Sequence, residues 1–337
     1  MLNFDPSRFL RIQTGTVTIA RDLGALVGRL VAEGADSLFF MGSGGAGILM
    51  QPAADLMRRG SKLPCHNVLC AEIVLTGHVA LGPKSVVVMP SLSGTTKESI
   101  AAMEYVRARG ATVISITGHA DTPLAKGADH AFVNFAEDDT SCEMFYVTSL
   151  VAALAVMQAR GERSDYDRII GELAGLPQQL LAVKQAFEPR ADALARAIAA
   201  DGWHIITGSG AAWPQAYYYG MCILEEMQWI RTRPVHASDF FHGTLELVEK
   251  GVSVVVFAGE DETRPLTDRV IAFAKGYTDK LTVLDTRDLA TTGLSADLRA
   301  LLAPALLATV LERLSAHLEV MRNHPLVTRR YYKRVAY

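Results

Sequence analysis

The sequence lacks several features that would indicate whole classes of protein. Only 20% of its 337 residues are charged, and the formal net charge is −3 with a pI of about 6.3. A chain without an excess of positive charge is not expected to be a general nucleic-acid binder. No apolar run reaches the roughly 18–20 residues that span a bilayer, because charged residues interrupt every candidate. The sequence therefore predicts neither nucleic acid nor membrane as a partner.

Cysteine is scarce, and a secretory signal is not recognisable. The four cysteines are scattered through apolar surroundings without a CxxC pair. This pattern predicts buried free thiols in a reducing compartment rather than a metal site. The first residues, Met1-Leu-Asn-Phe-Asp-Pro6, lack a basic segment followed by an apolar core. We therefore expect a cytoplasmic protein that binds no metal.

Apolar residues, by contrast, are abundant. They make up 50% of the chain, and the mean hydropathy is +0.18. Such a composition favours α/β folds in which a parallel sheet is buried on both faces. Apolar segments typical of strands alternate with segments of helical periodicity, which predicts doubly wound parallel sheets with right-handed crossovers. The expected strands cover residues 37–41, 67–74, 85–90, 111–117, 130–135, 203–207, 252–258 and 281–284.

The order of these segments recurs in the two halves of the chain. A strand, a glycine turn and a helix occur around 42–47 and again around 208–212. A strand, a polar turn and a helix occur around 91–96 and again around 259–264. We interpret this recurrence as a weak internal duplication of one α/β domain. The expected domains are residues 1–170 and 171–337.

The glycine turn Gly42-Ser-Gly-Gly-Ala-Gly47 follows a predicted strand and opens a predicted helix. This arrangement directs backbone N–H groups toward an anion. The spacing also satisfies the G-x-G-x-x-G pattern of dinucleotide-binding proteins. Glu72 is the only plausible acidic residue for a ribose, and it is not convincingly placed. A tight strand-to-helix turn without a ligand is the alternative.

Three hydroxyl side chains, Ser91, Ser93 and Thr96, lie on one polar turn before a predicted helix. Each can donate a hydrogen bond to a phosphate oxygen, and the helix N-terminus adds a favourable field. A dense cluster of hydroxyls suits the terminal phosphate of a small sugar. The alternative is an ordinary group of residues that cap the helix.

A possible acid/base pair lies in the second half of the chain. An apolar helix expected over 217–230 carries two adjacent carboxylates, Glu225 and Glu226. At 3.6 residues per turn, only one of them can share the buried face of the helix. His242 precedes a second helical run expected over 244–249. Burial raises the pKa of a carboxyl group and histidine titrates near neutrality, so the two types together suit proton transfer. Taken singly, each residue is as well explained by an ordinary structural role.

These stretches resemble the SIS (sugar isomerase) domain family. The motif Ser91-x-Ser-Gly-x-Thr96 is similar to its phosphosugar-binding loop, and the duplication resembles the isomerase module of glucosamine-6-phosphate synthase. Glu226 and His242 resemble the pair used by that module and by fructosamine-6-phosphate deglycases. The resemblance to the deglycases extends over 239–249, 259–264 and the tail 329–332 with the terminal Tyr337.

The resemblance implies a fold, a site and partners. The fold would be two flavodoxin-like three-layer α/β/α domains in tandem. Glu226 would be the base, and His242 the acid that opens the sugar ring. The active site would be shared in a homodimer, with the histidine contributed by the other subunit and no cofactor required. The phosphate-binding residues implied are Ser91, Ser93 and Thr96 with the backbone of Gly44 and Gly45.

The implied function is a deglycase that cleaves a 6-phosphorylated Amadori compound, a 1-amino-1-deoxyketose. Its products would be glucose 6-phosphate and a free amine or amino acid. Another SIS enzyme, an aldose–ketose isomerase or an aminosugar-phosphate deaminase, is the nearest alternative. A non-catalytic sugar-phosphate sensor is a second alternative. Such sensors usually add a helix-turn-helix domain, for which the roughly 35 residues before the first strand leave no room.

Some positions depart from the family pattern. Gly44-Gly-Ala stands where relatives often place a hydroxyl, and Thr95 stands where many SIS loops have glutamate. His236 occupies a place where a lysine-directed deglycase has an acidic residue, so the released amine stays open. The basic tail could bind a carboxylate of the substrate, close over the site or be a solvated end. Its basic residues are Arg322, Arg329, Arg330, Lys333 and Arg334.

Overall fold

The computed structural model describes residues 1–332 and 334–336. Lys333 and Tyr337, which belong to the predicted tail, lie outside the described residues. Contacts divide the chain into two compact units, and the boundary predicted after residue 170 stays a prediction. The first unit comprises Asp5–Gln179 and Gly293–Leu298, and the second comprises Met1–Phe4, Leu180–Thr292 and Arg299–Tyr337.

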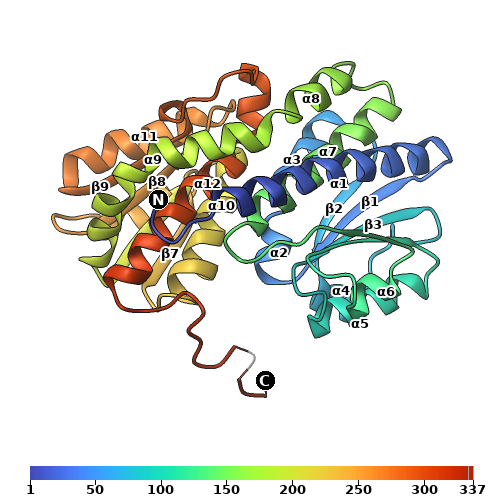
Figure 1. Ribbon diagram of the computed structural model, residues 1–337, viewed down its shortest axis with the longest axis horizontal. Coiled ribbons are helices and arrows are strands. Elements are labelled where there is room, and N and C mark those ends of the chain that lie inside the picture. The colour runs from blue at the N-terminus through green and yellow to red at the C-terminus, as the bar shows by residue number, and fades with distance from the viewer. Residues whose placement is uncertain (333, 337) are drawn as a thin grey trace. The chain divides into compact units, whose positions relative to one another are not determined.

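The first unit contains a five-stranded parallel sheet in the order β2-β1-β3-β4-β5 (Figure 1). Every residue of β1 and β3 is buried, as expected for apolar strands in a sheet that is covered on both faces. The strand order reverses between β1 and β3, so their carboxyl ends form a topological switch point. The strands are β1 (Ser37–Gly42), β2 (Cys65–Leu69), β3 (Ser85–Ser91), β4 (Thr112–Thr117) and β5 (His130–Val133).

The prediction of a strand over 67–74 is wrong in its second half. The strand β2 ends at Leu69, and helix α4 (Cys70–Thr76) follows at once. Cys70 and Ile73 both belong to the hydrophobic core and are spaced as on one face of a helix. A short apolar run is ambiguous between strand and helix until its packing partners are known.

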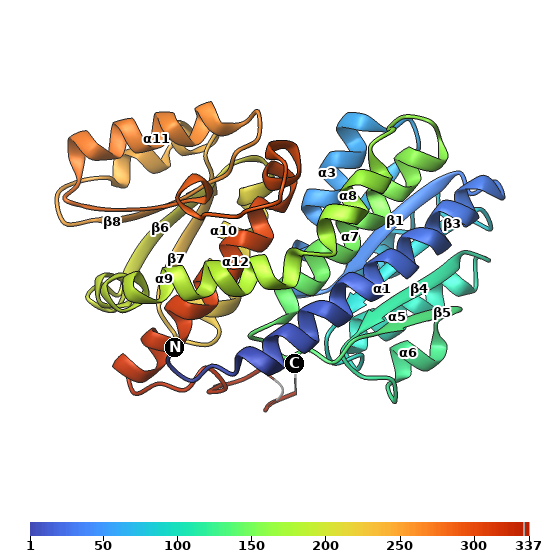
Figure 2. The same cartoon turned by 45° about the horizontal axis from the view of Figure 1, so that its top comes forward.

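Helices cover this sheet, and two of them, α1 and α7, lie side by side along most of their length (Figures 1 and 2). Asp5 begins α1, because its carboxylate accepts hydrogen bonds from the backbone N–H groups of Ser7 and Arg8. The helices are α1 (Pro6–Ala32), α2 (Gly44–Ile48), α3 (Gln51–Gly60), α4, α5 (Lys97–Arg107), α6 (Pro123–Gly127), α7 (Ser141–Ala159) and α8 (Tyr166–Leu173).

Two helices, α7 and α12 (Ala296–Met321), are long and apolar enough to cross a membrane by length and composition. Their most apolar windows are 89% and 83% buried within the protein, respectively. Core helices of soluble proteins have the same properties, so these two carry little weight as evidence for a membrane.

The second unit contains a four-stranded parallel sheet in the order β7-β6-β8-β9. The strands are β6 (Trp203–Gly208), β7 (Arg231–His236), β8 (Ser253–Ala258) and β9 (Lys280–Asp285). Longer helical segments are α9 (Leu176–Ala199), α10 (Trp213–Tyr218), a π-helical segment (Tyr219–Glu225), α11 (Arg264–Tyr277) and α12. The short 3₁₀ segments are Gly210–Ala212, Phe240–His242, Thr244–Leu247 and Thr286–Asp288. The prediction of two parallel-sheet α/β domains is confirmed.

Strand β7 is absent from the prediction, which assigns these residues to a polar connection. Its sequence, Arg231-Thr-Arg-Pro-Val-His236, carries charges and a proline instead of an apolar run. A central strand tolerates neither, but β7 lies at the edge of the sheet, where proline is accepted.

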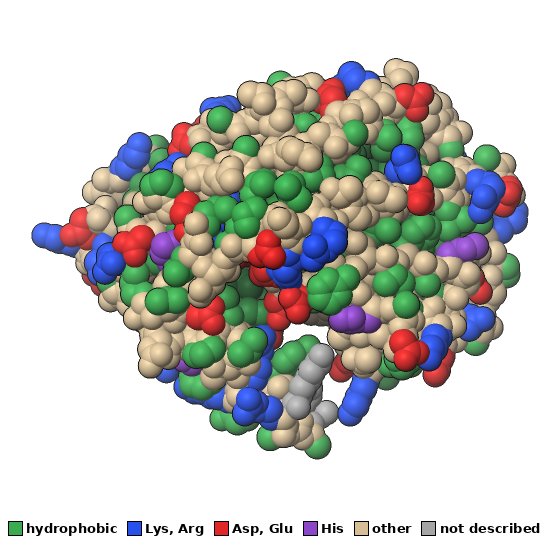
Figure 3. Space-filling model, viewed as in Figure 1, with side chains coloured by type: hydrophobic (Ala, Val, Ile, Leu, Met, Phe, Trp, Pro, Cys, Tyr) green, Lys and Arg blue, Asp and Glu red, His purple; other side chains and the backbone are tan. Residues whose placement is uncertain are grey.

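On the face shown in Figure 3, acidic and basic side chains are interspersed, which agrees with the small net charge.

A network of buried charges ties the N-terminal residues to the core of the second unit. Glu188 on α9 accepts hydrogen bonds from the Leu2 N–H at 2.8 Å and from Arg313 Nε at 2.6 Å. The Arg313 side chain is completely buried. Burial alone would raise the pKa of Glu188, but hydrogen bonds from Arg313, Leu2 and His317 outweigh it and lower the pKa to about 2.

We expect Glu188→Gln to destabilise the protein near neutral pH by about 1–3 kcal/mol, because it leaves the buried Arg313 charge without its full partner. The folded state holds Glu188 with a pKa below its usual 4.5. Its ionised form therefore stabilises the fold above that pH, and this stabilisation is lost as the pH falls toward 2. Urea unfolding at several pH values would show the difference between variant and wild type shrinking with acidification. A difference independent of pH would contradict this account.

Candidate functional site

The glycine turn of the first unit connects β1 to α2 at the switch point. A Cβ on Gly42 would lie 2.5 Å from the Cα of Gly47, so these two positions require glycine for close backbone approach. Gly44 has a φ of 55°, in the left-handed region that glycine adopts readily. Sterics thus explain Gly42 and Gly47 without a ligand, and the proposed phosphate contacts at Gly44 and Gly45 stay predictions.

The serine loop, which we define as residues 91–96, connects β3 to α5 at the same switch point. Ser91 Oγ lies 3.5 Å from Thr96 Oγ1 and accepts a hydrogen bond from the Gly94 N–H at 3.2 Å. Thr96 occupies the N-cap position of α5 but makes no side-chain capping bond. The hydroxyls of Ser91 and Thr96 therefore converge at a helix N-terminus instead of capping it. Ser93 Oγ accepts a hydrogen bond from Thr95 Oγ1 at 3.1 Å.

The two turns are adjacent within the first unit. Ser43 Oγ and Ser99 Oγ, one from each turn region, lie 3.4 Å apart. Two helices, α2 and α5, begin at neighbouring strand ends with their N-termini at this edge of the sheet. Helix N-termini at a switch point are a preferred place for an anionic ligand.

The equivalent turns of the second unit are filled by one of the protein's own carboxylates. Asp261 Oδ2 accepts a hydrogen bond from the Ala211 N–H at 2.8 Å, and Oδ1 accepts one from the Thr263 N–H at 2.9 Å. A Cβ on Gly210 would lie only 2.3 Å from Asp261 Oδ2. The carboxylate thus occupies the place that an anion would take, which distinguishes this copy from the serine loop.

The helix that carries Glu225 and Glu226 differs from the prediction. The sequence predicts one regular helix over 217–230, whereas α10 ends at Tyr218 and the chain continues as a π-helical segment. The Glu226 N–H donates to Met221 O at 3.1 Å and the Gln228 N–H donates to Ile223 O at 3.0 Å, both across five residues. The argument that only one of Glu225 and Glu226 can share the buried face assumed 3.6 residues per turn, so it does not apply to this segment. Such π-helical turns are rare in proteins, and those that occur are often at functional sites.

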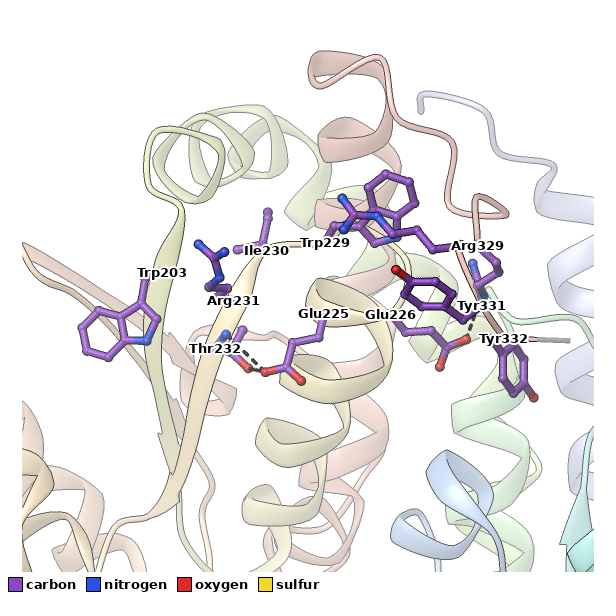
Figure 4. A pocket seen from close by; sticks show the side chains of 11 residues that line it. Trp203, Glu225, Glu226, Trp229, Ile230, Arg231, Thr232, Arg329, Tyr331 and Tyr332 are labelled. Carbon is purple, nitrogen blue, oxygen red and sulfur yellow. Dashed lines mark hydrogen bonds and ion pairs between the residues drawn. The ribbon is translucent and has the colours of Figure 1, made fainter. Parts of the chain in front are cut away.

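The side chains of Glu225 and Glu226 point in different directions from the end of the helix (Figure 4). Glu225 is exposed, and its Oε1 accepts hydrogen bonds from Thr232 Oγ1 at 2.7 Å and from the Thr232 N–H at 3.2 Å. Glu226 is half-buried, and its Oε1 lies 2.9 Å from Arg329 Nε in an ion pair. The structure thus gives Glu225 a local contact with the edge strand and Glu226 a partner from the C-terminal tail.

A cavity of about 750 Å³ adjoins both carboxylates (Figure 4). The end of the π-helical segment forms one wall, and the C-terminal tail forms another. The residues that line it are Trp203, Glu225, Glu226, Trp229, Ile230, Arg231, Thr232, Arg329, Arg330, Tyr331 and Tyr332. The sequence left the position of the tail open among several alternatives, because an irregular tail has no periodicity from which its packing could be inferred.

His242 is exposed on the surface of the second unit and is not among the residues that line this cavity. The expected helix over 244–249 is a 3₁₀ segment that ends at Leu247, and His242 ends the preceding 3₁₀ segment. Buried Phe240 anchors that segment in the core. The serine loop belongs to the first unit, and His242 and Glu226 belong to the second.

His236 lies at the carboxyl end of β7, where its ring meets the Trp213 ring edge-on at a centroid distance of 5.5 Å. Among residues 1–332 and 334–336, no group of three or more histidine, cysteine, aspartate or glutamate residues is arranged to hold a metal ion.

Known proteins are similar to this chain over nearly its whole length. The sequence pattern of the SIS domain matches residues 33–160, which include the serine loop. Fructosamine deglycase FrlB of Bacillus subtilis (strain 168) is 32% identical over 327 residues, covering 96% of this chain and 99% of the relative. Fructoselysine 6-phosphate deglycase of Escherichia coli (strain K12) is 28% identical, covering 91% and 88%.

Solved structures show the same fold. A Bacillus subtilis protein assigned as a phosphosugar isomerase superposes with a TM-score of 0.88 at 31% identity, covering 96% of this chain and 99% of that one. The C-terminal domain of glucosamine-fructose-6-phosphate aminotransferase from Francisella tularensis has a TM-score of 0.80 at 17% identity, covering 95% of each chain. At that identity, the second likeness concerns the fold alone.

We expect Asp261→Ala to destabilise the second unit by about 1–3 kcal/mol, because the N–H groups of Ala211 and Thr263 lose their acceptor. Asp261→Asn keeps one side-chain oxygen as an acceptor and should therefore lower the free energy of unfolding by less. Chemical unfolding of the wild type and both variants measures this order. Equal stability of the wild type and the alanine variant would show that the carboxylate does not hold the turn together.

Proposed function

Since this chain belongs to the SIS-domain family of the fructosamine deglycases, we propose that it cleaves a 6-phosphorylated Amadori compound with water. The products are glucose 6-phosphate and a free amine or amino acid. The chain is an enzyme of the deglycase type, and the proposal concerns its substrate, products and catalytic residues. The observation that carries it is the half-buried Glu226 carboxylate, which lines a cavity at the end of a π-helical segment.

The proposed phosphate site is the serine loop with the glycine turn. The close approach of Ser91 Oγ and Thr96 Oγ1 at the start of α5 supports it, because hydroxyl donors and the helix dipole both favour an anion. Ser93 and the backbone of Gly44 and Gly45 complete the proposed set. A phosphate held there is remote from the reacting carbons, so its binding energy orients the open-chain sugar for reaction.

Glu226 is the proposed base. It directly follows the π-helical segment and lines the cavity, where its carboxylate pairs with Arg329. Glu225, one residue away, is engaged by Thr232 instead. The structural difference between the neighbours supports the choice of Glu226.

His242 is the proposed acid that assists ring opening by passing a proton to the ring oxygen. It is exposed at the end of its 3₁₀ segment, so its side chain is accessible to another subunit. We therefore propose a homodimer with shared active sites, in the cytoplasm. The isolated chain leaves the histidine outside the Glu226 cavity, which is consistent with a contribution across subunits.

The proposed reaction balances without a cofactor. Glu226 removes a proton from C1 of the open-chain ketose, the electron pair forms a C1–C2 double bond, and the C2 oxygen takes up a proton to give the enaminol. Protonation at C2 then gives the Schiff base of an aldose. Water adds to the C1–N double bond, and the resulting carbinolamine releases the amine and leaves glucose 6-phosphate. Each proton transfer by a placed side chain contributes roughly 10²–10⁴-fold to the rate.

We expect Glu226→Gln and His242→Asn each to lower the turnover of a phosphorylated fructose–amino acid conjugate by roughly 10²–10⁴-fold. Both variants should remain folded, because both side chains lie at least partly at the surface. Glu225→Gln is the matched control and should retain activity, since the Glu225 carboxylate is held by Thr232 on the edge strand β7. Release of glucose 6-phosphate is the measurement.

The same assay separates the proposal from its alternatives. Fructose 6-phosphate and glucosamine 6-phosphate are tested beside the conjugates, because an isomerase or a deaminase would convert one of them. Binding without turnover of any of these compounds would indicate a sensor. Wild-type turnover by Glu226→Gln would contradict the assignment of the base, whichever substrate is used.

A further inference from the structure

The cavity beside Glu226 is rich in arginine. Its lining contains Arg231, Arg329 and Arg330, which outnumber the two glutamates. The chain as a whole carries a net charge of −3, so this local excess of positive charge runs against the overall balance. A cavity of this kind is suited to a substrate with a negatively charged group in addition to its phosphate.

Arg329 is held firmly in the cavity wall. Its side chain is only 13% exposed. Its Nη1 donates to Leu326 O at 2.6 Å and to Thr328 O at 3.1 Å, both in the same tail. Its Nε donates to Glu226 Oε1 at 2.9 Å. The guanidinium is thus oriented by its own backbone and directed at the proposed base.

The tail is fixed to the end of the helix by further contacts. The Arg330 guanidinium lies 3.8 Å from the centre of the Trp229 ring, and Trp229 adopts a left-handed φ of 55°. The other side of the tail is joined to Gln228, whose Nε2 donates to His324 O at 2.7 Å. The end of the helix and the tail therefore form one built wall of the cavity, with Arg329 at its centre.

We propose that Arg329 binds a carboxylate on the amine part of the substrate. This carboxylate replaces Glu226 as the partner of the Arg329 guanidinium. This inference rests on the proposed function of Glu226 as the base. In the free enzyme, the guanidinium pairs with Glu226 and reduces its tendency to accept a proton. A substrate carboxylate offers the guanidinium an equivalent partner, and Glu226 is released toward C1. Base activation is then coupled to recognition of an amino acid.

The geometry restricts which carboxylate can do this. Arg329 lies at hydrogen-bond distance from the base that must reach C1. The carboxylate must therefore be only a few bonds from C1, as in a conjugate linked through the α-amine of an amino acid. The apolar part of the wall, which includes Trp229 and Tyr331, leaves room for the amino acid side chain.

The test compares two synthetic substrates that differ in one group. These are the 6-phosphates of fructosyl-alanine and of fructosyl-ethylamine, of which only the first has a carboxylate. The variants are Arg329→Gln, Arg329→Lys, which keeps the charge, and Arg334→Gln, a tail control outside the cavity lining. The full-length enzyme is used throughout, and kcat and KM are measured for glucose 6-phosphate release.

We expect Arg329→Gln to raise KM for the alanine conjugate by roughly 10- to 100-fold, because a charge-assisted hydrogen-bond pair is lost. KM for the ethylamine conjugate should change little, and its kcat should be equal or higher, because the ion pair between Arg329 and Glu226 is removed. For Arg329→Lys, KM for the alanine conjugate should lie between the values of the wild type and Arg329→Gln. Arg334→Gln should have the kcat and KM of the wild type for both compounds.

An equal fall in kcat on both conjugates, with KM unchanged, would overturn the inference, since Arg329 would then only position Glu226. Equal use of both conjugates by the wild type would overturn it as well. Release of glucose 6-phosphate from neither conjugate by the wild type would overturn the proposed function itself, which distinguishes the two failures.

Discussion

The ion pair between Glu226 and Arg329 is the interaction on which this account depends. A carboxylate at the carboxyl end of a helical segment lies in an unfavourable field, because the helix dipole has its negative end there. A guanidinium at 2.9 Å compensates that field. The same pair places the C-terminal tail against the cavity, so one contact links the helix geometry, the base and the tail.

The two units share a parallel-sheet architecture but differ in the loops at the ends of their strands. In the first unit, the loops at the switch point converge their hydroxyls and helix N-termini on a place suited to a phosphate. In the second unit, Asp261 fills the equivalent turn. This unit instead carries Glu226 directly after its π-helical segment. Under the proposed function, the same βα pattern would provide an anion site in the first unit and an acid/base residue in the second.

Much of the fold and part of the site follow from sequence. Buried strands such as β1 and β3 are continuous apolar runs between glycine or polar turns, and periodicity finds them. Strand β7 escapes this reasoning because its edge position lets it carry charge and proline. The π-helical segment escapes it because side-chain patterns do not report hydrogen bonds across five residues. The contact between Arg329 and Glu226 joins positions far apart in sequence, and only tertiary packing brings them together.

The most direct test of the central claim is a crystal structure of the assembled enzyme with a stable substrate analogue, in which the C2 carbonyl is reduced to an alcohol. The account predicts the phosphate within hydrogen-bond distance of the hydroxyls of Ser91, Ser93 and Thr96. It also predicts the Glu226 carboxylate next to C1. A phosphate bound away from the serine loop, or a Glu226 carboxylate remote from C1 in every active site, would contradict it.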